Sequence, residues 1–209
     1  MNNKISKAVI NRMPKYYRYL GYLKEKGVER VSSKELGEML DSTASQVRQD
    51  FNNFGGFGQQ GYGYKVSELL IEIERILGLG IEYNTVIIGA GNIGQAMAKH
   101  QSFKNSGFHL MALFDKNPEL IGSTFGEAEV LDESELEDFL QNNKIDIAFI
   151  CVGEKSAQRI AETLEKGGVR GLFNFALVDL KVGKSVAVKN VHLVEDLFLL
   201  SYYLNGEAR

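Results

Sequence analysis

The sequence lacks the features that mark extracellular and membrane proteins. A single cysteine, Cys151, excludes an internal disulfide and a cysteine-rich metal site. The longest uninterrupted apolar run, residues 147–152, is far too short to cross a bilayer, and the N-terminus has no secretory hydrophobic segment. Because Cys151 lies within that run, a packed core thiol is favoured over a reactive redox switch. We therefore expect a cytoplasmic protein with no membrane partner.

The hydrophobic and charged contents of the chain are ordinary, but its charge is unevenly distributed. Of its 209 residues, 44% are hydrophobic and 24% are charged, as in a globular protein that buries a core. The net charge is only −3, yet residues 1–65 carry 11 Lys and Arg against 6 Asp and Glu. A basic segment is the part of a chain suited to a polyanion. If charge were the only sign, a chance imbalance of surface charge would explain it equally well.

The basic segment begins with helical patterns. A short helix is expected over residues 5–13 and a second over residues 14–26, since proline suits the first position of a helix and Gly27 is a good terminator. Apolar residues of the second helix fall on one face. This leaves Arg12 and Lys15 for solvent or phosphate.

Two short helices with N-terminal capping boxes follow, one starting at Ser32 with Glu35 and the other at Thr43 with Gln46. The outward-facing polar residues of the second of these helices are Ser45, Arg48, Gln49 and Asn52. An exposed arginine can bind guanine at two points, and Asn or Gln can bind adenine in the same way. The pattern therefore indicates a DNA recognition helix, with a merely solvated helix face as the alternative.

A glycine-rich segment with aromatic residues, 55–64, comes next. A flexible linker would lack the aromatic residues, whereas a tight hairpin here would form the wing of a winged helix and enter a minor groove. A helix is expected over residues 66–77, ended by Gly78 and Gly80. We place the boundary of this N-terminal DNA-binding domain at residue 80.

The strongest motif follows an apolar strand-like run and comprises Gly89, Ala90, Gly91, Asn92, Ile93 and Gly94. A dinucleotide-binding turn needs glycine for a sharp turn at Gly89, for close approach of pyrophosphate at Gly91 and for close helix packing at Gly94. The phosphates would lie on the free N–H groups of a helix N-terminus. A glycine turn that serves structure alone is the alternative reading.

The residues after the glycine motif favour the dinucleotide. A second strand-like run, residues 110–114, ends at Asp115, which lies 21 residues after Gly94. A carboxylate at that distance can accept both ribose hydroxyls, and it would repel a 2′-phosphate, so NAD(H) is favoured over NADP(H). Lys116 follows directly and can soften that preference.

Alternating helices and strands continue the domain, with helices expected over 133–142 and 156–166 and strands over 145–152 and 171–176. This order predicts an α/β fold with a doubly wound parallel sheet over residues 81–190. The ligand of such a sheet lies beyond the carboxyl ends of the strands. Further candidate contacts at those ends are Val152, Gly153, Asn174 and Phe175.

The last part of the chain, residues 191–209, contains a helix pattern over residues 193–204 that is apolar nearly all round. Such a helix must be buried. No later segment is there to cover it, so another domain or another subunit must do so.

These motifs occur together in one known family. With residues 12–20, the run 47–58, Gly61-Tyr62-Gly63-Tyr64 and Asn174-Phe175-Ala176, the chain resembles from end to end the Rex family of bacterial redox-sensing transcriptional repressors. The resemblance implies a homodimer with an N-terminal winged helix, a C-terminal Rossmann domain and a last helix swapped into the partner. It also implies a repressor that binds NADH and NAD+ and leaves its operator DNA when NADH binds.

The resemblance assigns individual roles as well. It implies that Arg48 reads bases and that Gln49 lies beside the DNA backbone. The wing tip would comprise Gln59, Gln60 and Gly61. Many family members have a basic residue where this chain has Gln60, and some have Tyr and Asp where this chain has His100 and His192. Two histidines there would add pH sensitivity, with packing or surface roles as the alternative.

The main rival is a small NAD-dependent oxidoreductase. A dehydrogenase needs a substrate pocket and a general acid or base beside the nicotinamide. Residues 177–209 are too few for a substrate domain, and no Ser/Tyr/Lys or His/Asp set is evident. A nucleotide-binding regulator with only protein partners is a third reading. We expect a non-enzyme with no catalytic residues, no metal and no small-molecule substrate.

Overall fold

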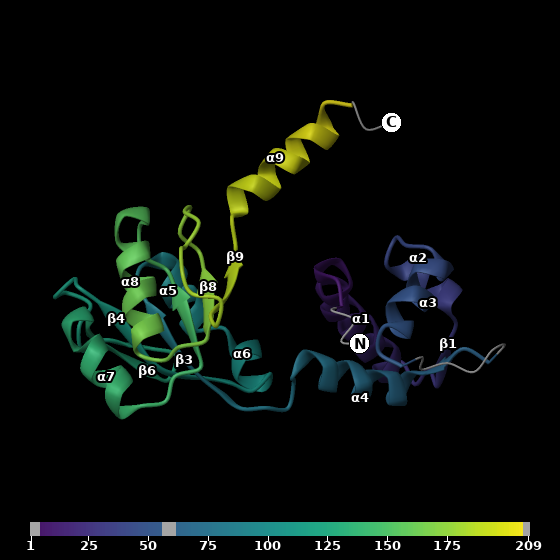
Figure 1. Ribbon diagram of the computed structural model, residues 1–209, viewed down its shortest axis with the longest axis horizontal. Coiled ribbons are helices and arrows are strands. Elements are labelled where there is room, and N and C mark those ends of the chain that lie inside the picture. The colour runs from purple at the N-terminus through teal and green to yellow at the C-terminus, as the bar shows by residue number, and fades with distance from the viewer. Residues whose placement is uncertain (1–4, 56–61, 207–209) are drawn as a thin grey trace. The chain divides into compact units, whose positions relative to one another are not determined.

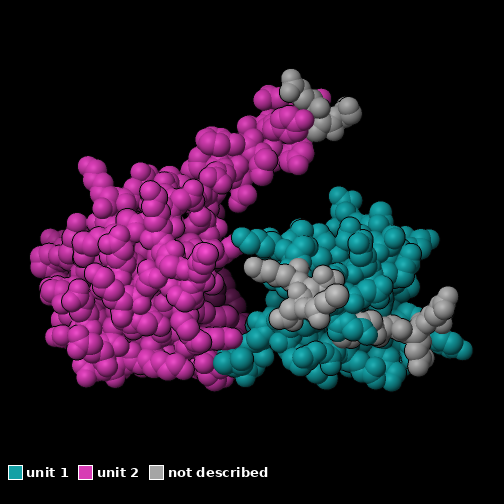
Figure 2. All heavy atoms as spheres, in the orientation of Figure 1, with its two compact units in different colours: residues 1–81 teal, residues 82–209 magenta. Residues whose placement is uncertain are grey.

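The computed structural model describes residues 5–55 and 62–206, and the chain divides into two compact units, residues 1–81 and 82–209 (Figure 2). This division falls one residue after the boundary expected from the sequence. Over the described residues, no helix has both the length and the apolar character needed to span a membrane.

The described part of unit 1 is mostly helical (Figure 1). It also has one short antiparallel pair of strands, in which Val31 lies opposite Tyr64. Its elements are α1 (Lys7–Glu25), β1 (Arg30–Val31), α2 (Ser33–Met39), α3 (Ala44–Asn52), β2 (Tyr64–Lys65) and α4 (Val66–Leu77). The helix expected over 66–77 is confirmed, and it ends at Gly78 in the left-handed conformation, φ 69°. Residues 56–61, on which most of the predicted wing falls, lie outside the described residues.

Helix α1 corrects one sequence prediction, because it is a single helix that continues through Pro14 instead of two helices that meet there. An interior proline costs about 3 kcal/mol. One buried stripe runs along both halves of α1, and each large apolar side chain that it buries contributes about 1.5–3 kcal/mol. Its members are Val9, Met13, Tyr16, Leu20 and Leu23. The packing of this stripe therefore outweighs the cost of the proline.

The predicted helix caps of unit 1 are confirmed at Ser32 and half confirmed at Thr43. Ser32 Oγ accepts from the Glu35 backbone N at 3.1 Å, and Glu35 Oε2 accepts from the Ser32 N at 2.7 Å, which completes a capping box. Thr43 Oγ1 accepts from the Gln46 N at 3.1 Å. The Gln46 side chain does not return to the cap, however, because it donates to Asp50 Oδ1 at 2.7 Å.

Unit 2 is built on a central β-sheet (Figure 1). The sheet has seven strands in the order β5-β6-β4-β3-β7-β8-β9. All neighbouring strands are parallel except β5 and β6, so the predicted doubly wound parallel sheet is confirmed. Its strands are β3 (Tyr83–Ile88), β4 (Phe108–Asp115), β5 (Thr124–Phe125), β6 (Ala128–Asp132), β7 (Ile147–Ile150), β8 (Gly171–Asn174) and β9 (Ala187–Asn190). Strands β5, β6 and β9 are additions to the elements expected from the sequence.

Helices cover both faces of this sheet. Successive side chains along a strand point to opposite faces, so each apolar strand supplies core residues to both sides. Val86 and Ile88 of β3 join the core under α7 and α8, whereas Ile87 joins the core that includes Met97 and Phe103 of the α5 and α6 side. The helical segments of unit 2 are α5 (Asn92–Ala98), α6 (Gln101–Asn105), a 3-10 turn (Glu133–Glu135), α7 (Leu136–Asn142), α8 (Glu154–Lys166) and α9 (Leu193–Leu204).

Helix α9 has the bounds expected from the sequence, but its twelve residues are all exposed in the single chain. Phe198 is 66% exposed and Leu204 is 77% exposed. Figure 1 shows α9 after β9, with no other described element of its unit packed along it. Among the residues that the structure describes, the single chain therefore leaves this strongly apolar helix exposed.

Candidate functional site

The strand order reverses between β3 and β7, which lie side by side with Ile88 opposite Ile150. From β3 the chain crosses to β4 on one side, and from β7 it continues to β8 on the other side. In a parallel sheet such a reversal opens a crevice at the carboxyl ends of the strands. The glycine motif follows β3 at this end of the sheet.

The three glycines of the motif have three different surroundings. Gly89 has φ 101°, and a Cβ placed there would lie 2.7 Å from the carbonyl carbon and oxygen of Cys151. A Cβ on Gly94 would collide with the carbonyl oxygen of Gly89. A Cβ on Gly91, by contrast, would meet nothing within 4 Å. The predicted turn and packing roles of Gly89 and Gly94 are therefore confirmed, and Gly91 leaves open space at the backbone.

That open space lies at the N-terminus of α5. Gly91 is the residue that precedes the helix, and its carbonyl accepts the first helical bond from the Gln95 N at 2.9 Å. The leading N–H groups of a helix have no acceptor within it, so those of Asn92 and Ile93 are available to an anion. Both residues are exposed, while Gly94 is buried against β3.

Asp115 ends β4 and lies beside the glycine loop. Its Oδ2 accepts from the Ala90 N at 2.6 Å, and its Oδ1 accepts from the Asn117 N at 2.9 Å. Each carboxylate oxygen has a second lone pair, so acceptor capacity for hydroxyl groups remains. The adjacent Lys116 is exposed. Asp115 thus shapes the loop and also presents a carboxylate beside it.

The ends of β7 and β8 complete this edge of the sheet. Gly153 is exposed, precedes α8 and has open space at its Cα, with the half-buried Val152 before it. Asn174 is fully buried, and its Nδ2 donates to the Val178 carbonyl at 2.8 Å while its Oδ1 accepts from the Ala176 N at 3.0 Å. The Asn174 side chain therefore holds the loop after β8. Beside it, the ring of Phe175 is half-buried.

Cys151 also lies at this edge, just after β7. Burial raises the pKa of its thiol to about 12, so the thiolate is scarce at neutral pH. This agrees with the packed thiol that the sequence favours over a redox switch.

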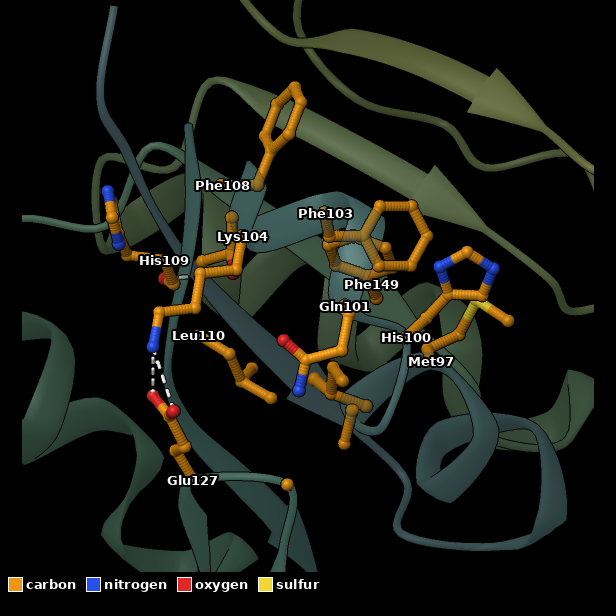
Figure 3. A pocket seen from close by; sticks show the side chains of 14 residues that line it. Met97, His100, Gln101, Phe103, Lys104, Phe108, His109, Leu110, Glu127 and Phe149 are labelled. Atoms are coloured by element: carbon orange, nitrogen blue, oxygen red, sulfur yellow. Dashed lines mark hydrogen bonds and ion pairs between the residues drawn. The ribbon is translucent and has the colours of Figure 1, made fainter. Parts of the chain in front are cut away.

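A separate cavity of about 100 Å³ lies on the α5 and α6 side of the same sheet (Figure 3). Thr85 and Leu110, near the starts of β3 and β4, line it, so it is at the opposite end of the strands from the glycine loop. Beside it, Lys104 Nζ pairs with Glu127 Oε2 at 2.7 Å. His100 also lines this cavity and is exposed. Its lining shares no residue with the glycine motif.

His192, the other histidine singled out in the sequence, precedes α9. Its Nδ1 lies 2.8 Å from Glu195 Oε1. Its Nε2 is buried and has no hydrogen-bond partner within the described chain. The single chain therefore gives this ring one partner and leaves its other nitrogen unsatisfied.

In unit 1, α3 presents the predicted polar stripe to solvent. Its exposed residues are Ser45, Arg48, Gln49 and Asn52. Arg48 Nη1 donates to Ser33 Oγ of α2 at 2.9 Å, so the guanidinium links α3 to α2. Lys15 is exposed on α1. The predicted wing tip, Gln59, Gln60 and Gly61, lies outside the described residues.

Arg12, which the sequence leaves for solvent or phosphate, stays partly exposed but also directs its guanidinium to Asp50 of α3. Arg12 Nε lies 2.6 Å from Asp50 Oδ2, and Nη2 lies 2.7 Å from Oδ1. Tyr16 OH donates to Oδ2 at 3.0 Å, and Gln46 Nε2 donates to Oδ1 at 2.7 Å. Sequence reasoning missed Asp50. The available signal was a carboxylate between Val47 and Phe51 on the inner face, where a charge requires a partner.

The electrostatics of this group follow from its contacts. Burial by itself would raise the pKa of the Asp50 carboxyl, but hydrogen bonds from Arg12, Gln46 and Tyr16 outweigh burial and hold that pKa below its ordinary value. Burial and the hydrogen bond to Asp50 both raise the pKa of Tyr16. At neutral pH the group therefore consists of a carboxylate, a guanidinium and a neutral phenol.

Comparison with known proteins agrees with this division of the chain. A family model described as the N-terminus of putative DNA-binding proteins matches residues 4–52, and one described as a CoA binding domain matches residues 81–178. A redox-sensing transcriptional repressor Rex from Clostridioides difficile strain 630 is 54% identical over 203 residues, which are 97% of this chain and 97% of the relative. The Rex repressor of Thermoanaerobacter pseudethanolicus is 52% identical over 98% of this chain and 91% of the relative. The chain belongs to the Rex family of redox-sensing transcriptional repressors.

Solved structures of Rex repressors share the whole fold. A structure of the repressor RSP in complex with NAD+ and operator DNA matches with a TM-score of 0.93 and 51% identity, over 99% of this chain and 95% of that chain. The structure of RSP with NADH matches with a TM-score of 0.90 and 48% identity, over 99% and 97%. Membership of the Rex family confirms the predicted regulator and rejects the oxidoreductase alternative.

Proposed function

We propose that this chain represses transcription by binding operator DNA through unit 1 and leaves that DNA when NADH binds to unit 2. The observation that carries the proposal is the glycine motif at the reversal of the sheet, where Gly89 and Gly94 are packed tightly and Gly91 is open. A structural turn needs only the tight packing of Gly89 and Gly94, whereas the open backbone at Gly91 leaves room for a pyrophosphate. The similarity to a repressor solved with both NAD+ and operator DNA supports the same assignment.

For the cofactor, the pyrophosphate of NADH or NAD+ lies over Gly91 and the leading N–H groups of α5. The carboxylate of Asp115 accepts the ribose hydroxyls and disfavours a 2′-phosphate, which makes NAD(H) the preferred ligand. The remaining contacts proposed at this edge are Ala90, Asn92, Ile93, Gly94, Lys116, Val152, Gly153, Asn174 and Phe175. Because Asn174 is held within its loop, it acts by placing Phe175 rather than by its own amide. The dinucleotide is the signal here, and the chain performs no chemistry on it.

For DNA, the exposed stripe of α3 enters the major groove. Arg48 keeps most of its five N–H donors beyond the one given to Ser33, so it can contact a guanine edge. Gln49 and Asn52 lie on the same exposed face, and Ser45 and Lys15 are placed to contact phosphates. We include the wing tip on the strength of the family resemblance alone. Arg12 acts through Asp50 and not as a primary contact.

We also propose a homodimer in which α9 of one copy packs on the other copy. The nine apolar or aromatic side chains of α9 that are exposed in the single chain support this, because such a helix is stable only when covered. Unit 2 offers an apolar groove of about 380 Å³ over the faces of β7, β8 and β9, lined in part by Phe103, Phe149 and Phe173. A repressor of this kind works in the cytoplasm, where its DNA lies.

The test is a gel-shift titration of the full chain on genomic fragments, without cofactor, with NAD+ and with NADH. The proposal predicts a subset of fragments that shift without NADH and are released when NADH is added, with NAD+ far less effective. DNA binding that ignores both cofactors would contradict the redox response.

A further inference from the structure

The buried carboxylate of Asp50 links α1 and α3 of unit 1, through side chains that lie one helical turn apart on each helix. Arg12 and Tyr16 are four residues apart on α1, and Gln46 and Asp50 are four residues apart on α3. Residues at this spacing share one face of a helix. The side chains of Arg12, Tyr16 and Gln46 meet at the two oxygens of Asp50. The Asp50 side chain is fully buried, while that of Arg12 is 32% exposed.

Ring contacts extend this group toward strand β2. The rings of Tyr16 and Phe51 are 4.8 Å apart, and those of Phe51 and Tyr64 are 5.1 Å apart in an edge-on arrangement. Tyr64 belongs to β2, which pairs with β1. One connected group therefore fixes the inner face of α3 to α1 and to β2.

The inner and outer faces of α3 rotate together about the helix axis, since a helix of nine residues moves as a rigid body. Asp50 and Arg48 are separated by about 200° around the helix axis, so a rotation about that axis that moves one carboxylate oxygen moves the guanidinium as well. The fork of Arg12 on Asp50 has a fixed planar geometry that an ammonium group cannot reproduce. Such a fork adds a directional constraint on the rotation of α3 to the constraint that apolar packing already provides.

We propose that Arg12, Tyr16 and Asp50 form a positioning cluster that sets the rotation of α3 on α1 and thereby the specificity of DNA recognition. The inference rests on the proposed function, in which α3 reads bases. Lys15 lies on the same helix as Arg12. The cluster therefore also fixes the position of this proposed phosphate contact on α1 relative to the proposed base contacts on α3. Its loss should lower sequence specificity more than general DNA affinity.

Stability and positioning can be separated by comparing one single variant with one double variant. Asp50→Asn leaves the Arg12 charge without its partner, which should lower the thermal unfolding midpoint. Asp50→Asn combined with Arg12→Met removes both charges, and this should recover much of the midpoint because replacing both partners is far less costly than removing one. Neither the single nor the double variant has the Arg12–Asp50 pair that fixes the rotation of α3. Glu72→Gln, which removes a half-buried carboxylate that pairs with Arg75 on α4, is the control.

The experiment uses the full chain and two duplexes, one selected by the unaltered chain from random-sequence DNA and one scrambled from it. We expect the ratio of the two affinities, measured well below each unfolding midpoint, to fall by roughly tenfold or more in the single and the double variant. We expect the Glu72→Gln ratio to match the unaltered chain. Arg12→Lys should lower the ratio too, because it keeps the charge and loses the fork.

The outcomes distinguish this inference from the function on which it rests. An unchanged ratio in the double variant would overturn the positioning role and leave DNA recognition by α3 intact. A parallel fall in both affinities at constant ratio would reduce the cluster to a stabilising contact. If the unaltered chain selected no sequence at all, the proposed repressor function would fail first and the positioning role with it.

Discussion

Helices α3 and α9 differ in whether the chain itself completes their surroundings. The inner face of α3 is buried against α1 and β2, and only a polar stripe that includes Arg48 and Gln49 faces solvent. Helix α9 is apolar on nearly all sides and exposed on all of them. An element whose apolar face is already buried can offer polar groups to a polar partner, whereas an uncovered apolar helix requires an apolar one. The contrast explains why we assign DNA to α3 and a second copy of the chain to α9.

The largest effect should come from removing α9. A chain that ends at Val191 keeps the hydrogen bond from the Val191 N to the Asn174 carbonyl, so β9 stays paired. We expect this chain to be monomeric or aggregated and to bind operator poorly with or without NADH. Light scattering after size exclusion measures the first point and gel shift the second. A chain that lacks only residues 205–209 is the control, and a truncated dimer that still responds to NADH would refute the role of α9.

The next effect concerns the open glycine. Gly91→Val places a branched side chain where pyrophosphate must approach, and the backbone there, φ −72° and ψ −168°, is one that valine tolerates. We expect NADH affinity to fall by about 100-fold or more while DNA binding persists, which gives constitutive repression. Fluorescence titration with NADH measures the loss. Gly94→Val should instead impair folding, since its side chain meets the Gly89 carbonyl.

How far sequence could predict these sites depends on how local their causes are. The roles of Gly89 and Gly94 follow from a turn between one strand and the next helix, so a motif of six residues was enough to predict them. Asp115 could be placed because strand, helix and strand have narrow length ranges. The bounds of α9 followed from its apolar run.

Other features depended on contacts between distant segments. Arg12 and Asp50 are 38 residues apart, and only tertiary packing brings them together, so the sequence predicts Arg12 facing solvent or phosphate and not a buried carboxylate. The same packing carries α1 through Pro14. Short elements such as α6, β5 and β9 span five residues or fewer, which is too few for a periodic pattern to distinguish them from loops.

A moderate effect should follow from Arg48→Ala, which tests whether the polar face of α3 binds DNA. If Arg48 contacts a base edge, specific binding should weaken by about 1 to 3 kcal/mol. Lys15→Ala should weaken binding to all sequences alike and lower the salt dependence. Footprinting over a range of salt concentrations distinguishes the two. Unchanged operator affinity with Arg48→Ala would reject α3 as the reader.

The smallest effect is expected at Asp115. Asp115→Ala removes the ribose contact and also the acceptor for the Ala90 N, so it should weaken both cofactors. The loss should be greater for NADH than for NADPH, by roughly tenfold, because the carboxylate repels the 2′-phosphate as well. Calorimetry with both dinucleotides gives the comparison. Equal losses would limit Asp115 to holding the glycine loop.

The most direct test of the account is the thermodynamic coupling between the two ligands. If one dimer binds operator and NADH in competing states, each ligand must weaken the other by the same factor, with a coupling of about 1 to 3 kcal/mol as the usual range. Operator affinity should be measured with and without saturating NADH, and NADH affinity with and without saturating operator. The account predicts two equal factors, both well above one. An NADH affinity that is the same with and without operator would contradict it.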